Sequence, residues 1–418
     1  MTPVARKIRV IVAGAGDRGG THAGYALQHP EEVEVVGVAE PREYQRKAMA
    51  DAHGIPGENV FTDWREMAGR ERFADAVLVT TSDAMHVEPV KAFAEKGYHI
   101  MLEKPMAPTP EGCCAIIDAV KANDVILSVG HVLRYTPYTR TVKKILDAGA
   151  IGEIVCIQRL EPLGYWHQAH SFVRGNWHNE AESSFMLLAK CCHDIDWLHY
   201  IMGKRCTSVS SFGSLKHFRA SERPEGAADH CLDCSVEAEC PYSARKIYMG
   251  RLARGETSWP LSVVDPEATQ VTLEAALRNG PYGRCVYACD NDVVDNQVVN
   301  MQFEDGATAS FTMTCFNQAG HRRTNVFGTR GEIRGTGDKI EVFDFMTDKW
   351  STVEIDCGSV DVTGGHGGGD TVLMERFVAA VASGDQSLVL SGPDETLESH
   401  LIVFGAEKAR KQHCVVDL

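Results

Sequence analysis

Short apolar runs alternate with amphipathic segments along the first third of the chain. Runs that predict strands covered on both faces lie at residues 8–13, 31–39, 74–80, 99–102 and 125–129. Segments with helical spacing lie at residues 21–28, 88–96, 110–123 and 138–148. Because strands that alternate with helices pair in parallel, this pattern predicts an α/β fold with a doubly wound sheet over residues 1–140.

The pattern changes after residue 150. Strands separated by glycine turns are expected from Ile154 (IVCIQRL), at 293–303, at 307–315 and onward to Val360. Helices are expected from about Ser184 to Met202, at 371–382 and at 395–411, the last of them capped near Ser391. We therefore expect a second domain over 141–390, with an insertion at 215–248. A C-terminal helix, within 391–418, should pack back on the first domain.

Composition narrows the class of protein. The chain has 418 residues, too many for one core, and its 44% hydrophobic and 24% charged residues are typical of globular proteins. A formal net charge of −15 gives no electrostatic support for nucleic-acid binding. No apolar run approaches the length of a membrane span, and no signal-peptide core precedes the first strand, so a cytoplasmic location is expected.

The first predicted strand leads directly into a GxGxxG motif at residues 14–19 that opens the next helix. In a dinucleotide-binding fold, the first glycine makes a tight turn and the second lets the backbone approach a pyrophosphate. The third glycine allows the helix to pack closely on the strand. The motif has the required context between a strand and a helix. The predicted cofactor-binding residues here are Gly14, Gly16, Asp17, Arg18 and Gly19.

Glu40 ends the second predicted strand, where a dinucleotide fold needs an acid for the ribose hydroxyls. A carboxylate there would repel a 2′-phosphate, which favours NAD over NADP. Arg42 weakens this preference, because an arginine can accept that phosphate. Thr81 and His86 follow the strand at 74–80, at the same edge of the sheet, and are further predicted cofactor contacts.

The stretch around which we expect the chain to be organised is Glu103-Lys104-Pro105, which follows the strand at 99–102. Pro105 ends that strand and keeps Lys104 extended. Ligands of open α/β sheets bind beyond the carboxyl ends of the strands, so an acid and an amine are placed at the rim of a binding crevice. The alternative is a surface turn that carries two charges.

Residues 165–177 are rich in aromatic side chains, histidine and arginine and show no regular period, so a loop is expected. Aromatic faces stack on sugar rings, and arginine and histidine hydrogen-bond hydroxyl or anionic groups. The alternative is a loop packed on its own aromatic residues. The predicted substrate-binding residues here are Tyr165, Trp166, His170, Arg174 and Trp177.

The helix predicted over 184–202 has two faces. Its buried stripe consists of Leu188, Cys191, Ile195, Leu198 and Met202, and a second face holds Lys190, His193, Asp194 and Trp197. A histidine one turn from a lysine should lose affinity for its proton and stay a neutral base. We expect His193 and Lys190 to act in catalysis and Asp194 to bind substrate; a structural His–Asp pair is the alternative.

The motifs together resemble the Gfo/Idh/MocA oxidoreductase family: GxGxxG, an acid after the second strand, Glu103-Lys104-Pro105, and Arg134-Tyr135-Thr136-Pro137. The resemblance implies an N-terminal Rossmann domain and a C-terminal α+β domain with a large open, mainly antiparallel sheet. It also implies that Lys104 contacts the nicotinamide ribose and the substrate, and that Glu103 and Arg134 lie on the cofactor side.

In that family a helix carries an acid and, four residues later, the catalytic histidine. Here His193 matches the histidine, but position 189 is alanine and Lys190 stands one residue on. This departure suggests a subfamily with a different substrate, anionic or glycosidic. The open sheet of the family often forms an oligomer contact, so a homo-oligomer, a dimer or a tetramer, is expected.

These features predict NAD-dependent transfer of a hydride from a ring hydroxyl of a sugar or glycoside. One alternative is a redox-neutral glycoside hydrolase that keeps NAD bound and passes through oxidation, elimination, hydration and reduction. A second alternative is a regulatory protein that binds NAD without chemistry, although the presence of Lys104 and His193 argues against it.

Most of the 14 cysteines are expected to be reduced. Cys231, Cys234 and Cys240 have the spacing of metal ligands and predict a structural zinc site, with His217, His230, Cys285 or Cys289 as the fourth ligand. The glycine-rich stretch 364–370 is expected to be a loop, with His366 and Asp370 as candidates for the cleft and His366 as a substrate contact.

Overall fold

The structure, a computed structural model, describes residues 6–358 and 366–418. Its first half is a six-stranded parallel sheet in the order β3-β2-β1-β4-β5-β6. The strands are β1 (Ile8–Ala13), β2 (Val33–Ala39), β3 (Val60–Phe61), β4 (Ala76–Val79), β5 (His99–Leu102) and β6 (Leu127–Val129). The order reverses beside β1, so the predicted doubly wound fold is confirmed.

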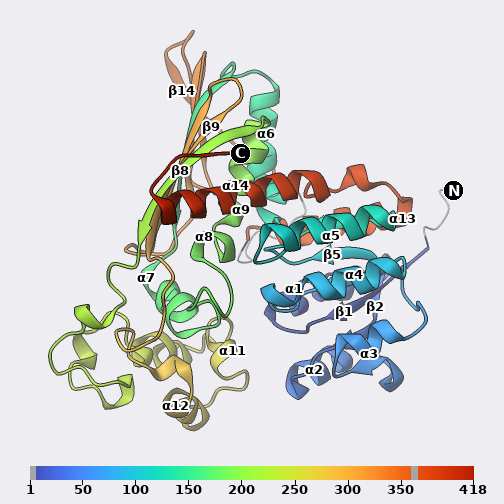
Figure 1. Cartoon of the computed structure of the whole chain (residues 1–418), viewed down its shortest axis with the longest axis vertical. Helices are drawn as coiled ribbons and strands as arrows, with labels where there is room; N and C mark the ends of the chain where they lie inside the picture. The colour runs from blue at the N-terminus through green and yellow to red at the C-terminus, as the bar shows by residue number, and fades with distance from the viewer. Residues whose placement is uncertain (1–5, 359–365) are drawn as a thin grey trace.

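Helices cover both faces of this sheet (Figure 1). They are α1 (Asp17–Gln28), α2 (Glu43–His53), α3 (Trp64–Gly69), α4 (Val87–Glu95) and α5 (Pro110–Ala122), with α6 (Pro137–Asp147) leading to the second half. The central strands β1 and β4 are buried on both faces, apart from Arg9 near the start of β1, which explains the nearly continuous apolar runs in the sequence.

The second half is built on a nine-stranded sheet in the order β14-β13-β12-β11-β7-β10-β9-β8-β15. Only the β7–β10 pair is parallel, so the sheet is mixed and mostly antiparallel, as expected. Its strands are β7 (Ile154–Pro162), β8 (Cys206–Ser214), β9 (Asn296–Phe303), β10 (Thr308–Thr314), β11 (Arg323–Gly328), β12 (Gly331–Gly335), β13 (Ile340–Asp344), β14 (Lys349–Val353) and β15 (Val416–Asp417).

Helices of the second half lie beside this sheet and in the long connection from β8 to β9. They are α7 (Tyr165–His167), α8 (Met186–Ala189), α9 (Cys192–Met202), α10 (Gly250–Ala253), α11 (Leu261–Val264) and α12 (Gln270–Asn279). Two longer helices, α13 (Gly369–Ser383) and α14 (Pro393–Gln412), follow the last long strand. The connection spans 215–295, so it is longer than the expected insertion at 215–248. In Figure 1 it forms the lobe at the lower left, across from the first sheet.

The last two long helices return to the first domain. Apolar side chains of α13, among them Leu373 and Phe377, belong to the core of the first sheet, although we expected this helix in the second domain. Helix α14 packs on α5 and also on β8 and α9, so it joins the two halves. Ser391 does not cap it, because its hydroxyl bonds the Val129 carbonyl and the Tyr135 hydroxyl instead.

Two other expectations were wrong. The helix expected over 184–202 is two helices, α8 and α9, separated at Lys190 and Cys191. The loop expected over 165–177 is largely helical, with α7 running into a π-helix at Gln168–Arg174. The predicted extension of the sheet to Val360 and the start of the loop at 364–370 fall in 359–365 and so lie outside the described residues.

Candidate functional site

The loop between β1 and α1 has the close backbone approaches that the glycine motif predicts. Gly14 has φ +99°, and a Cβ on it would lie 2.6 Å from the Thr80 carbonyl oxygen. A Cβ on Gly19 would lie 2.1 Å from the Gly14 carbonyl oxygen. Since only glycine fits at these two positions, the helix N-terminus is held against the strand ends, and its amides form a cradle suited to a pyrophosphate.

Glu40 is buried at the end of β2, with 2% of its surface exposed. Its Oε2 accepts a hydrogen bond from the Ala15 amide (2.8 Å), and Arg42 donates from Nε to Oε1 (2.7 Å) and from NH2 to Oε2 (2.9 Å). Burial opposes ionisation, but the hydrogen bonds from Arg42 outweigh it and lower the pKa of Glu40. A carboxylate and a guanidinium therefore stand together beside the glycine loop.

Glu103 links the glycine helix to the strand ends. Its Oε1 accepts hydrogen bonds from Arg18 Nε (2.7 Å) and contacts His22 Nε2 (2.8 Å). Arg18 also pairs with Asp370, which hydrogen-bonds His366 Nδ1 (2.9 Å). Burial works against the charge on Glu103, but Arg18 and His22 outweigh it and hold the pKa of Glu103 well below its usual range. Arg18, Glu103 and His366, all predicted site residues, thus belong to one chain of contacts.

Lys104 reaches from the first half of the molecule to the second. Its Nζ donates a hydrogen bond to the Ala189 carbonyl oxygen (2.7 Å), at the end of α8. Ala189 is the last residue of α8, because the helical conformation is interrupted at Lys190 and Cys191. The position where the family carries an acid therefore offers Lys104 a backbone oxygen.

His193 lies on the first turn of α9 and is 3% exposed. Its Nδ1 has no hydrogen-bond partner among the described residues. Its ring centroid lies 5.8 Å from that of His131 and 5.8 Å from that of His366. Burial, followed by the charge on Lys104, lowers the pKa of His193 well below its ordinary value. The direction of this pKa shift agrees with the expected neutral imidazole, but its causes are burial and Lys104 rather than Lys190.

Two further buried histidines, His131 next to His193 and His400 next to His131, were not predicted as site residues. His131 follows β6, and its ring lies 5.4 Å from the ring of His400 on α14. Nε2 of His400 accepts a hydrogen bond from the Met106 amide (3.0 Å), and Nδ1 faces the Thr396 carbonyl (2.9 Å), which fixes a neutral tautomer. Burial lowers the pKa of His131 to about 3 and that of His400 to about 4.

These two histidines predict that the protein loses stability in mild acid. The unfolded chain takes up protons near pH 6.5 but the folded chain does so only near their lowered pKa values, so stability falls as the pH drops below about 6.5. Each histidine contributes up to ~1.4 kcal/mol per pH unit. Urea unfolding at pH 7, 6 and 5 measures this, and His400→Gln should flatten the dependence while His413→Gln, at an exposed position, should not. Equal pH dependence in both variants would refute the assignment.

Lys190 belongs to a charge network in the second half of the molecule. Its Nζ lies 3.7 Å from Glu161 Oε1, and Arg322 Nε lies 2.9 Å from Glu161 Oε2. Both carboxylate oxygens of Asp194 are bonded by Arg322, and Oδ1 also accepts from Arg159 Nε (2.8 Å). Asp194 is fully buried, so its partners are these arginines and not the expected substrate.

The predicted aromatic segment divides between two environments. His170 is buried against Tyr248 and Tyr282, and Trp177 Nε1 donates to Asp83 Oδ2 (3.2 Å), across to the first half. Tyr165 is 39% exposed, and Trp166 stacks with His167 and Arg251. His167 was not among the predicted residues, yet its pKa is lowered well below the usual value by burial and then by the charge on Lys190, which places it near that lysine.

Three predicted residues have structural partners instead of facing the cleft. Arg134 is 1% exposed and makes a two-pronged ion pair with Asp196 (2.7 and 2.8 Å). His86 is buried between the carbonyls of Pro105 and Thr81, so it fixes two strand-end loops. Arg174 is directed toward the cysteine-bearing insertion. All three side chains, which were expected to contact a ligand, are bonded within the fold instead.

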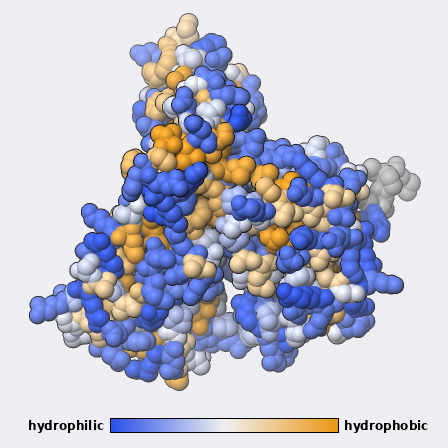
Figure 2. Space-filling view, viewed as in Figure 1, coloured by the Kyte–Doolittle hydropathy of each residue, from blue (hydrophilic) through white to orange (hydrophobic). Residues whose placement is uncertain are grey.

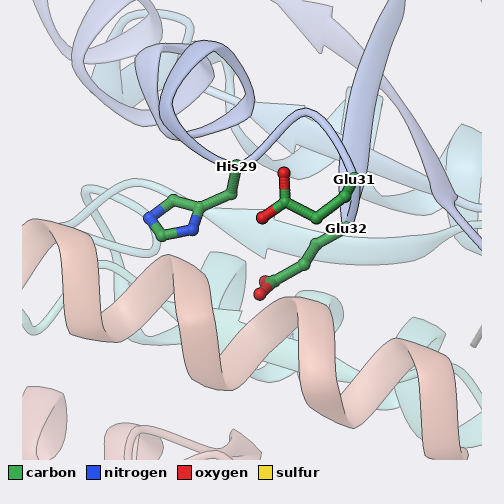
Figure 3. A group of neighbouring side chains, drawn as sticks. All are labelled: His29, Glu31 and Glu32. Carbon is green, nitrogen blue, oxygen red and sulfur yellow. The ribbon is translucent and has the colours of Figure 1, made fainter.

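One further group of metal-ligand type lies on the surface, at the turn from α1 to β2. His29, Glu31 and Glu32 place their ligand atoms within 4.8 Å of one another (Figure 3). Both glutamates are exposed, and Glu32 accepts a hydrogen bond from Tyr25 (2.9 Å). The group lies at the carboxyl end of α1, whereas the glycine loop precedes the amino end of the same helix.

The surface is hollowed between the first domain and the insertion lobe (Figure 2). The carboxyl ends of β1 and β5 face this hollow, as a ligand site at the edge of an α/β sheet requires. Over residues 6–358 and 366–418, no helix is long and apolar enough to cross a bilayer.

The fold and the glycine loop define a protein with a dinucleotide-binding domain joined to an α/β domain. Residues 8–131 match the model of the oxidoreductase family with an NAD-binding Rossmann fold, and residues 143–418 match the model of its C-terminal alpha/beta domain. The chain therefore belongs to the Gfo/Idh/MocA oxidoreductase family, and the resemblance inferred from the motifs is confirmed.

Individual relatives are distant. Over 326 residues the chain is 23% identical to YteT of Bacillus subtilis (strain 168), named as an oxidoreductase, with 72% of this chain and 71% of that protein covered. It is 27% identical over 226 residues to inositol 2-dehydrogenase 4 of Saccharopolyspora erythraea, covering 54% of this chain and 62% of the relative. It is 31% identical over 174 residues to levoglucosan dehydrogenase of Pseudarthrobacter phenanthrenivorans, covering 41% and 43%. In these last two the chain matches less than two thirds of the relative.

Solved structures agree with the fold along the whole chain. Levoglucosan dehydrogenase in complex with NADH superposes with a TM-score of 0.72 at 20% identity, covering 99% of each chain. An oxidoreductase from Agrobacterium radiobacter in complex with NAD+, L-tartaric acid and magnesium gives a TM-score of 0.70 at 15% identity, covering 98% of each. At these identities the likeness concerns the fold.

Proposed function

We propose that this protein is an NAD-dependent oxidoreductase that oxidises a ring hydroxyl of a sugar or sugar derivative. The observation that carries the proposal is the approach of Lys104, from the end of β5, to the α8–α9 break beside His193. An ammonium group can hydrogen-bond the oxygen of a substrate hydroxyl, and a neutral imidazole can accept its proton. The names of the inositol and levoglucosan dehydrogenases support a sugar as the substrate class.

The glycine loop fits a dinucleotide, because Cβ atoms on Gly14 and Gly19 would collide with backbone and the helix N-terminus opens onto the loop. Gly16, Asp17 and Thr81 would line the pyrophosphate side, and Glu40 would take the ribose hydroxyls. When bound, NAD supplies the acceptor for a carbinol hydride.

The protein's own groups handle the oxygen and its proton. His193 takes the hydroxyl proton onto an imidazole nitrogen, which burial keeps neutral. Lys104 donates a hydrogen bond to the same oxygen and stabilises the negative charge that grows on it. Lys190, paired with Glu161, adds positive charge close to this position. Tyr165, Trp166, Trp177 and His366 remain the candidates for holding the sugar.

The test is to incubate the purified protein with NAD and a panel of sugars, inositols and glycosides, and to follow NADH formation. NADH that appears with at least one sugar supports the proposal. Release of an aglycone from aryl glycosides without net NADH would instead favour the redox-neutral glycosidase, for which a 2,7-anhydro-N-acetylneuraminate hydratase, 26% identical over 194 residues, is a loose precedent. Tight NAD binding without any turnover would favour a regulatory protein.

Glu40 gives a prediction about cofactor choice. Glu40→Gln keeps an acceptor for the Ala15 amide but removes the charge that repels a 2′-phosphate and frees Arg42. We expect the ratio of the Kd for NADP to that for NAD to fall by about tenfold, or ~1.4 kcal/mol. Titration of both dinucleotides by intrinsic fluorescence measures the ratio. Arg42→Ala serves as the comparison, since it should raise the ratio; an unchanged ratio in Glu40→Gln would contradict the role of the carboxylate.

The expected homo-oligomer also remains a proposal. Its support is an apolar surface over β8 and β9 (Figure 2), where Phe212 is 61% exposed and Val298 39% exposed. Exposed apolar side chains that gather on one sheet face are typical of an interface between subunits.

A further inference from the structure

The connection between β8 and β9 encloses a cavity that the proposed oxidoreductase function does not use. Its volume is about 290 Å³, far above the ~10–15 Å³ that one water requires. Cysteines from two parts of the connection line it: Cys231, Cys234 and Cys240 from its first part and Cys285 from its last. The three cysteines expected as metal ligands therefore line one cavity together with a fourth. That fourth is Cys285, one of the four candidates that the sequence left open.

The four thiols surround the cavity instead of meeting at a point. All four are free cysteines, and within the part of the chain that the structure describes no three of their sulfur atoms lie within 4.8 Å of one another. Four thiolates around one zinc ion at ~2.3 Å would lie only ~3.8 Å apart. The observed arrangement leaves room for a larger group between the thiols than a single metal ion.

Arg174 indicates the charge of a group that would bind between the thiols. The residue is 3% exposed, its Nε donates to the Arg284 carbonyl (2.7 Å), and its NH2 donates to the Tyr242 carbonyl (2.9 Å) and contacts Cys231 Sγ (3.4 Å). Its NH1 is buried, has no hydrogen-bond partner among the described residues, and belongs to a side chain that lines the cavity. A buried guanidinium with an unsatisfied donor is stabilised most by an anionic acceptor.

The carboxylates around the cavity do not fill that need. Glu225 and Glu239 line it but are exposed to solvent, and Glu237 accepts a hydrogen bond from Ser243. The NH1 group of Arg174 is therefore available to donate a hydrogen bond to a group bound between the thiols.

We propose that these four cysteines bind an iron–sulfur cluster of the [4Fe–4S] type. Four thiolates on such a cluster place their sulfurs around a cubane core, further apart than on one zinc ion, and the assembly is anionic in its oxidised state. Arg174 supplies the buried counter-charge and an N–H···S contact of the kind that tunes such clusters.

The cluster has a structural role in this setting. The first part of the connection contains only short helical turns, at Ala220–Glu222, Cys231–Asp233 and Glu237–Glu239, so its own core is small. Arg174 is the last residue of the π-helix Gln168–Arg174, and Trp177 just beyond it bonds Asp83 of the first half. A cluster at the four cysteines would therefore fix the insertion to this segment, independently of which substrate the site binds.

The experiment is metal analysis of the full chain purified without oxygen. We expect about four iron and about four acid-labile sulfide per chain, a visible charge-transfer band, and an electron paramagnetic resonance signal after reduction with dithionite. Cys240→Ser and Cys285→Ser should each lose more than half of the iron and sulfide. Cys414→Ser, at an exposed cysteine far from the cavity, should keep all of it.

A second measurement covers variants that fail to fold. The wild-type chain, stripped by a chelator, is reconstituted either with ferrous iron and sulfide or with Zn²⁺ alone, and its resistance to proteolysis within 215–295 is followed. Protection by iron with sulfide but not by Zn²⁺ supports the cluster. One zinc per chain without sulfide, or four thiols that react freely with no metal bound under either condition, would overturn it. Neither readout depends on dehydrogenase activity, so failure here leaves the proposed function intact.

Discussion

Lys104→Ala should abolish turnover while the affinity for NAD stays within about tenfold of wild type, or ~1.4 kcal/mol. Lys104 donates to the Ala189 carbonyl (2.7 Å) and is the largest charge influence on His193. Removing it takes away both the charge that stabilises a developing alkoxide and the link between the two halves of the cleft. Loss of one such donor typically costs 10²–10³ in kcat, and the loss of positioning adds to it.

Two further variants make the measurement specific. Lys104→Met keeps most of the side-chain volume and should be as inactive as the alanine variant, which separates charge from packing. Lys91→Ala, at a lysine on α4 whose side chain is 44% exposed, should leave turnover unchanged. Steady-state kinetics on the best sugar, together with NAD titration, gives both quantities. Normal turnover in either Lys104 variant would remove the lysine from the mechanism.

The first sheet could be predicted because its signals are local. Continuous apolar runs followed by segments of helical period predicted β1 and β5 with the bounds that the structure shows. The glycine motif and Glu40 lie within a few residues of their strand ends. Glu103 and Lys104 were identified for the same reason, since the edge of an α/β sheet places strand-end residues at the site wherever the rest of the chain goes.

The helix break at Lys190 could not be predicted, because the apolar stripe from Leu188 to Met202 continues through it without interruption. The break makes sense only with Lys104, which takes the Ala189 carbonyl from a strand end 85 residues away. Local periodicity carries no information about such a partner.

The same limit explains the residues whose predicted roles changed. Asp194 looked available on its helix, but Arg159 on β7 and Arg322 before β11 occupy it. Arg174 lies in a segment rich in aromatics, yet its partners Tyr242 and Arg284 come from the inserted connection. Partners distant in sequence decide whether a charged side chain binds a ligand or is bonded within the fold. A single sequence shows only which side chains are candidates.

His193→Asn should lower kcat by about a hundredfold or more, because a positioned general base contributes roughly 10²–10⁴. Burial and the charge on Lys104 hold the pKa of His193 well below 6.5, so the imidazole is neutral throughout the physiological range. The base is lost only when it becomes protonated, which happens as the pH falls. We therefore expect the wild-type kcat to stay level from pH 8 down to below 6.5 and to decline only in more acidic solution.

The matched control is His413→Asn, the same change at an exposed histidine that ends α14. It should leave both kcat and the pH profile unchanged, whereas His193→Asn should remove the acidic limb as well as most of the rate. A loss of less than threefold in His193→Asn, or an acidic limb that persists in it, would assign the proton to another group. His366, whose ring lies 5.8 Å from that of His193 and which is held by Asp370, would then be the next residue to test.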